Sequence, residues 1–239
     1  MRIKKFKYGI VMAITVFCHA SGHAQFNANA SLALINRVIP GGTTGFVLEE
    51  LPVNERSDVF EIESRNNKIV LRGNNGVAVA SAFYYYLTHY CHAQVTWNGT
   101  NINIPKPMPR VSKKIHRISP YPYRYYLNYC TFNYSMSWWD WKRWEKEIDW
   151  MALHGINMPL AITAEEYTWY TVYKEMGFSD KELQTFFSGP AYFSWFWMGN
   201  LDGWGGPLPV SWMKSHMILQ QKILQREREL GMNPAGRDV

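Results

Sequence analysis

Tryptophans gather in one part of the chain, and they are the first residues whose type and spacing indicate chemistry. Ten of the eleven tryptophans fall between Trp138 and Trp212. An indole ring in a plain core is costly because its N–H needs a hydrogen-bond partner. This density of amphipathic rings favours an aromatic-walled pocket for a sugar or another ring-shaped ligand. Plain core packing is the alternative.

Two adjacent carboxylates, Glu165 and Glu166, have the chemistry of an acid and a nucleophile. Helix geometry also explains them, because Thr163 and Glu166 have the spacing of a capping box in which Glu166 reaches back to the Thr163 N–H. The helix dipole stabilises acids in a first turn whatever their function. Adjacent side chains also point in different directions and do not easily straddle one bond. We therefore assign neither a catalytic role, and place Glu166 at most beside the pocket.

Histidines and cysteines give no pattern of metal ligands. Only His89 and His92 lie close together, on either side of Cys91, and no second cluster has the spacing that would complete a tetrahedral set. The sequence predicts no metal site and no cofactor.

The elements that position these residues begin with a predicted strand over Tyr125–Cys130, kept extended at its start by prolines. Ile156–Ile162 is a second apolar run, of a length typical of a buried strand. The segment between them is an amphipathic helix that ends at Gly155. Two strands joined by one helix predict a βαβ unit with parallel strands.

One face of this helix is apolar and the other charged. The apolar face holds Trp141, Trp144, Ile148 and Met151. The charged face is predicted to hold Lys142, Arg143, Glu145, Lys146 and Asp149, with Arg143 and Glu147 one turn apart.

Three further segments follow. Ser179 and Glu182 form a second predicted capping box, which opens a helix to Phe187. Residues 189–209 are a long loop of glycines, prolines and tryptophans, and loops of that length are usually functional. Ser211 is the predicted cap of a last helix that ends at Gly231, with Trp212, His216, Leu219, Ile223 and Leu230 on one stripe.

Residues 25 to about 115 predict a small α/β module. Helices are expected over residues 31–39 and 77–90, and strands over 46–51, 59–64 and 68–72. Asn66-Asn67 supplies a tight hairpin turn. Residues 104–122, rich in proline, are interpreted as a connector with the domain boundary near residue 118. The basic run over residues 110–117 has two interpretations. One is a contact surface for a sulfated glycan, and the other is a solvated linker, which is the commoner case.

Beyond residue 124 the sequence resembles the start of the catalytic domain of the α-N-acetylglucosaminidases, glycoside hydrolase family 89, whose lysosomal member degrades heparan sulfate. The resemblance covers roughly residues 124–234 without a large gap. It rests on these residues: Arg124-Tyr125-Tyr126, Asn128, Cys130, Trp138-Trp139-Asp140-Trp141, Arg143-Trp144-Glu145, Glu147-Ile148-Asp149-Trp150-Met151-Ala152-Leu153, Gly155-Ile156-Asn157, Phe186-Phe187, Gly189-Pro190-Ala191, Met198-Gly199-Asn200-Leu201, Gly206-Pro207-Leu208-Pro209 and Ser211-Trp212.

The resemblance implies a binding site for a terminal N-acetylglucosamine. The positions carried over from the family are Asn128, Cys130, Trp195 and Met198. An asparagine amide offers both donor and acceptor to sugar hydroxyls, and Trp195 would lie against the apolar face of the ring. The family mechanism is retaining hydrolysis by two glutamates about 5–5.5 Å apart. Neither glutamate has a counterpart here, so the catalytic residues are predicted to be absent from the chain.

The first 24 residues have the pattern of a secretory signal, with a basic start, an apolar stretch over residues 8–17 and cleavage expected after Ala24. Without them the chain holds 21 basic and 19 acidic side chains, a net charge of +2, which gives no electrostatic case for nucleic acid. The apolar stretch is too short to span a bilayer. We expect an exported protein, periplasmic or extracellular, or lysosomal in a eukaryote, with Cys91 and Cys130 as free thiols.

The predicted fold class is α/β: a signal peptide over residues 1–24, an accessory α/β domain over 25–118, and the first part of an incomplete (β/α)₈ barrel over 119–239. Only 121 residues remain from residue 119, against about 250 in a full barrel. We expect that part to fold poorly by itself and to be inactive, because open strand edges stay unpaired.

Two functions fit these observations. One is the N-terminal part of an exo-acting α-N-acetylglucosaminidase, whose partner is a glycan with terminal α-linked N-acetylglucosamine. The alternative is a non-catalytic, glycan-binding remnant of a truncated reading frame. A secreted α/β protein unrelated to sugars is a third and weaker hypothesis.

Overall fold

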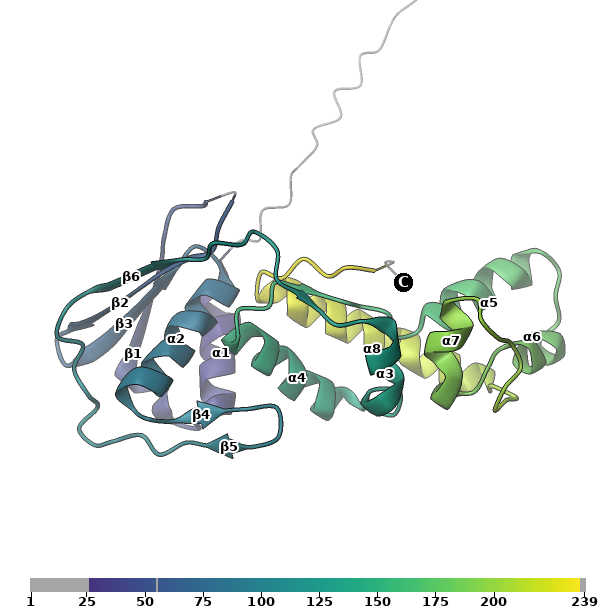
Figure 1. Ribbon diagram of the computed structural model, residues 1–239, viewed down its shortest axis with the longest axis horizontal. Coiled ribbons are helices and arrows are strands. Elements are labelled where there is room, and N and C mark those ends of the chain that lie inside the picture. Colours follow the sequence, from purple (N-terminus) through teal and green to yellow (C-terminus); the bar gives the residue numbers. More distant parts are fainter. Residues whose placement is uncertain (1–25, 55, 237–239) are drawn as a thin grey trace, which may run out of the picture.

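The computed structural model describes residues 26–54 and 56–236. The predicted signal peptide and its cleavage site lie outside the described residues. The molecule is elongated (Figure 1): a sheet with two helices occupies one end, two long helices run through the middle, and a group of short helices forms the other end.

The N-terminal sheet has four strands in the order β1-β3-β2-β6. β1 (Phe46–Glu50) runs parallel to β3 (Lys68–Gly73), whereas β2 (Val59–Arg65) is antiparallel to both β3 and β6 (Ile115–Ile118). The turn between β2 and β3 has positive φ at Asn66 (51°) and Asn67 (60°). This is the two-residue hairpin that the sequence predicts, because two left-handed residues match the twist of the flanking strands.

Two helices cover one face of this sheet. α1 (Ala28–Val38) is capped by the Asn27 side chain, and α2 (Gly76–Tyr90) by the Asn75 side chain. A short 3-10 helix, η1 (Gly42–Gly45), leads from α1 into β1. The strand pair β4 (Gln94–Val95) and β5 (Thr100–Asn101) follows α2 as a separate hairpin.

The proline-rich segment over residues 104–122 is more than a connector. Its residues 115–118 form β6, which pairs with β2 at the edge of the sheet. Two members of the basic run contact one carboxylate of β2, because Lys114 Nζ lies 2.7 Å and His116 Nδ1 3.2 Å from Glu61. Part of the basic run is therefore held by the sheet.

The barrel-like part starts with two short parallel strands. β7 (Tyr125–Tyr126) pairs with β8 (Met158–Pro159). Between them lie α3 (Tyr129–Ser135) and α4 (Trp141–Leu153). Leu160 also forms an isolated parallel bridge with Ala235, outside the two named strands. The predicted parallel unit is confirmed, although the strands are shorter than expected, and the sheet is not closed.

After β8 the chain forms α5 (Glu165–Glu175), α6 (Asp180–Phe186), η2 (Pro190–Tyr192), α7 (Phe193–Trp197) and α8 (Val210–Glu229). The capping box of Ser179 and Glu182 at the start of α6 is confirmed. Ser211 is not the cap of α8, since the cap position is Pro209 and no side chain caps it. The predicted stripe faces the core in part, because Ile223 and Leu230 are buried and Trp212, His216 and Leu219 are half-buried. The buried side of α8 also includes Met213, Gln220, Leu224 and Glu227.

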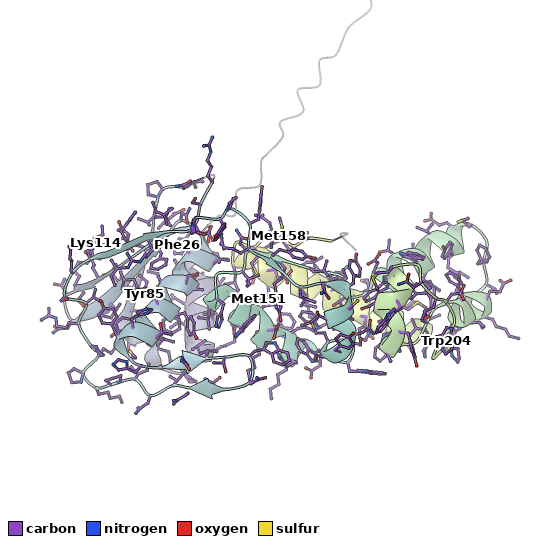
Figure 2. The ribbon with its side chains drawn as sticks, in the orientation of Figure 1. Phe26, Tyr85, Lys114, Met151, Met158 and Trp204 are labelled. Atoms are coloured by element: carbon purple, nitrogen blue, oxygen red, sulfur yellow. The ribbon has the colours of Figure 1, made fainter. Side chains whose placement is uncertain are left out.

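One hydrophobic core runs through both parts of the chain. α2 packs against α4, and α4 against α8. Ile148 and Met151 of α4 are buried in the same cluster as Phe83 and Tyr86 of α2. Met151 lies near the middle of the molecule in Figure 2, between the N-terminal sheet and the short helices around Trp204. At Gly76, the first residue of α2, a Cβ would lie 2.5 Å from the Leu230 carbonyl oxygen, so glycine permits α2 to approach the end of α8.

Ion pairs also join the two parts. Arg37 of α1 binds Asp149 of α4 through two bonds of 2.6 and 2.7 Å. Arg124 binds Asp58 across the boundary near residue 118 and also donates to the Gly155 carbonyl within its own part of the chain. The prediction that Asp149 lies on the exposed face of α4 is wrong, because the residue is only 6% exposed and faces α1.

Candidate functional site

Asn128 lies directly after β7, and its local structure differs from the prediction. It is the cap residue of α3 and not the end of a strand. Its Oδ1 accepts from the Thr131 backbone N–H at 2.9 Å and from the Thr131 hydroxyl at 2.8 Å. Within the described residues its Nδ2 has no hydrogen-bond partner, and the side chain is exposed. Its acceptor oxygen is therefore used by the helix, while its donor is available to a ligand.

Cys130 lies in the first turn of α3, so the expectation that it ends a strand is also wrong. The thiol is half-buried and free. Cys91, the other cysteine of the described chain, is free as well and buried among N-terminal core residues. The prediction of two free thiols is confirmed.

Trp195 and Met198 come from the segment that the sequence interprets as one long loop. That segment contains η2 and α7, and it closes on itself where the Gly189 N–H donates to the Trp204 carbonyl at 2.7 Å. Trp195 is on α7 and Met198 follows its last residue. The Trp195 ring packs edge-on against Tyr134 at 6.4 Å, and Met198 is 41% exposed.

A set of polar contacts fastens α3 to the η2–α7 segment. The Asn133 side chain accepts from the Ser194 backbone N–H and donates to the Pro190 carbonyl at 2.8 Å. The Ser194 hydroxyl donates to the Tyr129 carbonyl. Phe132 and Trp197 pack with ring centroids 5.2 Å apart. These contacts connect residues about 60 positions apart in the chain and hold the two helices together.

The structure therefore brings the four predicted binding residues onto two packed helices. Asn128 and Cys130 lie at the start of α3, and Trp195 and Met198 on and after α7. No hydrogen bond or ring contact among the described residues joins one pair directly to the other. The two helices pack together after the carboxyl end of β7, and the carboxyl ends of strands are where barrel enzymes build their sites.

Glu165 and Glu166 follow β8, and the predicted capping box is absent. The cap position of α5 is Ala164, with φ of 65° and no side-chain bond. Glu166 has no exposed surface, and neither of its carboxyl oxygens has a hydrogen-bond partner among the described residues. Burial raises the pKa of Glu166 to about 8, and the adjacent Glu165 adds to the shift. Glu166 is thus fully buried and protonated at neutral pH.

Sequence reasoning missed the role of Glu147. This residue of α4 is 1% exposed, and its carboxylate accepts from Tyr126 OH at 2.9 Å and from Trp97 Nε1 at 3.0 Å. The predicted neighbour Arg143 is confirmed, with its guanidinium 2.9 Å from Glu147 Oε2. A signal was present, because Glu147 stands three residues after Trp144 and four before Met151, on the apolar side of the helix.

The tryptophans serve the core more than the sequence suggests. Trp144 and Trp197 are 4% and 7% exposed. Five indole N–H groups are buried without a partner in the described chain, those of Trp144, Trp150, Trp169, Trp197 and Trp212. Much of the aromatic density is therefore packing, whereas Trp195 is half-buried and packs against the exposed Tyr134.

Cavities of about 290, 210 and 330 Å³ lie away from the four predicted residues. The first is an apolar hollow between α5 and α6, and the others lie where the N-terminal module meets α4 and the β6–β7 segment. Among residues 26–54 and 56–236, no group of three or more histidine, cysteine or acidic residues could hold a metal ion. No helix in those ranges has the length and apolar character needed to cross a membrane.

Comparison with known proteins gives a consistent result over most of the chain. The family model described as the α-N-acetylglucosaminidase (NAGLU) N-terminal domain matches residues 29–110. The model described as the α-N-acetylglucosaminidase (NAGLU) TIM-barrel domain matches residues 124–236. Human α-N-acetylglucosaminidase is 40% identical over 220 residues, which are 90% of this chain and 30% of the human protein.

Solved structures agree with the sequence matches. A family 89 glycoside hydrolase from Clostridium perfringens, in complex with 2-acetamido-1,2-dideoxynojirimycin, superposes with a TM-score of 0.84 at 40% identity. The match covers 87% of this chain and 24% of that structure. The same values hold for a complex with PUGNAc and for a doubly substituted Clostridium perfringens protein in complex with its substrate, GlcNAc-α-1,4-galactose. The chain thus spans less than a third of the relatives it matches.

Proposed function

Since the chain belongs to the α-N-acetylglucosaminidases of glycoside hydrolase family 89, we propose that it supplies the sugar-holding part of an exo-acting, retaining α-N-acetylglucosaminidase. The partner would be a glycan that ends in α-linked N-acetylglucosamine. In this proposal residues 119–239 carry the contacts to the sugar, and residues 25–118 form the accessory domain.

The observation that carries the proposal is the locked pair of helices at the end of β7. Asn133, Ser194 and the Tyr129 carbonyl hold α3 against α7, so the two predicted halves of the sugar site are fixed relative to each other. Fixing such a surface before the ligand arrives lowers the entropic cost of binding. The unpaired Nδ2 of Asn128 would donate to a sugar oxygen, and Trp195 would cover an apolar face of the ring.

Hydrolysis by the retaining route needs two carboxyl groups about 5–5.5 Å apart, one as acid/base and one as nucleophile. The carboxylates that follow β8 do not provide them, because Glu166 is sealed from solvent and Glu165 is its neighbour in the same helical turn. We therefore expect the 239-residue chain by itself to bind the sugar without cleaving it. Turnover of an aryl α-N-acetylglucosaminide by the purified chain would contradict this expectation.

The same proposal includes export. The basic and apolar pattern of residues 1–24 supports it. Expression with the leader should give a mature N-terminus at Gln25, and a protein that keeps residues 1–24 would contradict export.

Asn128→Asp tests the sugar contact without removing the helix cap. Aspartate caps a helix as well as asparagine does, but it replaces the free N–H donor by an acceptor. We expect the affinity for PUGNAc, an uncharged probe, to fall about tenfold, the loss of one hydrogen bond of ~1.4 kcal/mol. Affinity would be measured by ligand titration in NMR. Burial of Cys130 under the ligand should also slow its alkylation by iodoacetamide.

The matched control is Asn27→Asp, which changes the cap of α1 in the same way and far from the site. It should leave PUGNAc affinity unchanged. Equal affinities for the wild-type chain and Asn128→Asp, or no protection of Cys130 by PUGNAc in the wild-type chain, would refute the assignment of this surface to the sugar.

A further inference from the structure

A buried carboxylate in α4 connects parts of the chain that are distant in sequence. Glu147 Oε1 accepts from Trp97 Nε1 at 3.0 Å and from Tyr126 OH at 2.9 Å, and Glu147 Oε2 pairs with Arg143 at 2.9 Å. We call these four residues, Trp97, Tyr126, Arg143 and Glu147, the Glu147 cluster.

The members of the cluster come from different structural units. Trp97 lies in the loop between β4 and β5 of the N-terminal module. Tyr126 is the last residue of β7, two positions before Asn128. Arg143 and Glu147 are one turn apart on α4. One carboxylate thus joins the N-terminal hairpin to the strand end from which the candidate sugar site begins.

Aromatic packing restrains the cation of this cluster. The Arg143 guanidinium carbon lies 3.8 Å from the centroid of the Trp139 ring and 5.6 Å from that of Trp97. Trp139 in turn packs edge-on against Trp144 at 5.3 Å, and Trp144 contacts Phe132 of α3 at 6.4 Å between ring centroids. The cluster therefore reaches α3 by two routes, through the backbone after Tyr126 and through this series of rings.

The phenol of Tyr126 is suited to hold its bond at any physiological pH. Burial, together with the charge of Glu147, raises the pKa of Tyr126 well above its ordinary value, so the hydroxyl keeps its proton and remains a donor. The carboxylate receives three donors and leaves neither oxygen unpaired, which is the condition under which a buried charge is stable.

We propose that Glu147 is a positioning residue for the sugar site: through Tyr126 it fixes the end of β7 and the start of α3, and through Trp97 it makes that position depend on the N-terminal module. The proposal rests on the proposed function only in that Asn128 and Cys130 face the sugar. It gives residues 25–118 a second role beyond stabilising their neighbour.

The labelling rate of Cys130 tests this proposal in the 239-residue chain. Tyr126→Phe removes only the hydroxyl that binds Glu147, and Trp97→Phe removes only the indole N–H and part of the ring. We expect both variants to raise the rate at which iodoacetamide alkylates Cys130 by at least about threefold. Mass spectrometry of the Cys130 peptide over time measures this rate. Cys91, buried in the N-terminal core, reports general loosening in the same sample.

Tyr125→Phe is the matched control, because it removes a hydroxyl one residue away on the same strand, where the side chain is 53% exposed. Its Cys130 rate should equal that of the wild-type chain. Unchanged Cys130 rates in Tyr126→Phe and Trp97→Phe would overturn the proposal, as would a parallel rise at Cys91. If the wild-type chain fails to bind PUGNAc, the proposed function fails, but these ligand-free rates still decide whether Glu147 positions α3.

Discussion

At the scale of single residues, the carboxyl group of Glu166 is the clearest departure from what its position in a first helical turn suggests. It has no exposed surface and no partner among the described residues, and burial raises its pKa to about 8. Glu227 on α8 is similar, because it is 1% exposed, one of its oxygens is unpaired, and burial raises its pKa to about 8. Both groups stay neutral where an ordinary glutamate is charged.

Glu166→Gln is expected to stabilise the chain at pH 7.5 and to change little at pH 4. Between the ordinary pKa of 4.5 and about 8, the unfolded chain loses a proton that the folded chain keeps. The free energy of unfolding should therefore fall as pH rises in this window, by up to about 1.4 kcal/mol per pH unit for this group. Glutamine removes that dependence. Urea unfolding at several pH values measures it.

Glu175→Gln, on the exposed last turn of the same helix, is the control and should keep the pH dependence of the wild-type chain. If the free energy of unfolding depends on pH in the same way in Glu166→Gln and in the wild-type chain, Glu166 is charged in the folded state.

At the scale of elements, two serines with similar sequence surroundings have different structural roles. Ser179 caps α6, with its hydroxyl and the Glu182 carboxylate satisfying each other's backbone N–H groups. Ser211 has the same kind of position before an amphipathic run, yet α8 begins one residue earlier, at Val210, after Pro209. The Pro209 carbonyl accepts from the backbone N–H groups of Trp212 and Met213, and no side chain caps this first turn.

Ser179→Ala should cost about 1 kcal/mol of stability, since it leaves a backbone N–H at the start of α6 without its partner. Ser211→Ala should change the free energy of unfolding by less than about 0.5 kcal/mol, as is usual for surface substitutions. Urea unfolding of the two variants side by side compares them. A larger loss in Ser211→Ala than in Ser179→Ala would mean that the two helices begin differently in solution.

At the scale of the whole molecule, the N-terminal module and the start of the barrel share one hydrophobic core and several ion pairs. The sheet of the second part, however, consists of β7, β8 and a single bridge to Ala235. Open strand edges are exposed in such a sheet, and closure of a barrel is what normally removes them. The shared core favours folding of the two parts as one unit, whereas the open sheet destabilises the part beyond residue 118.

The expectation from the sequence, that the chain beyond residue 118 is poorly folded by itself, therefore remains a prediction. If it holds, near-ultraviolet dichroism from the ten tryptophans of residues 138–212 is weak and the melt has low cooperativity. The exposed sheet edges are the reason. In that case the ligand, labelling and urea experiments above require a chain that completes the barrel. A single cooperative transition with strong tryptophan dichroism would show that the shared core outweighs them.

The amino-acid sequence by itself determined the parallel unit of β7 and β8, the Asn66-Asn67 hairpin, the end of α4 at Gly155 and the family. The hairpin and the helix end follow from residues a few positions apart, the parallel unit from the geometry of a strand–helix–strand connection, and the family from a motif of many uncommon residues in one order. Only the tertiary structure decided that Asp149 faces Arg37, that Glu166 is buried without a partner among the described residues and that Glu147 joins Trp97 to Tyr126. The physical reason is that burial and pairing of a charged side chain depend on partners tens of residues away, whose positions no local pattern contains.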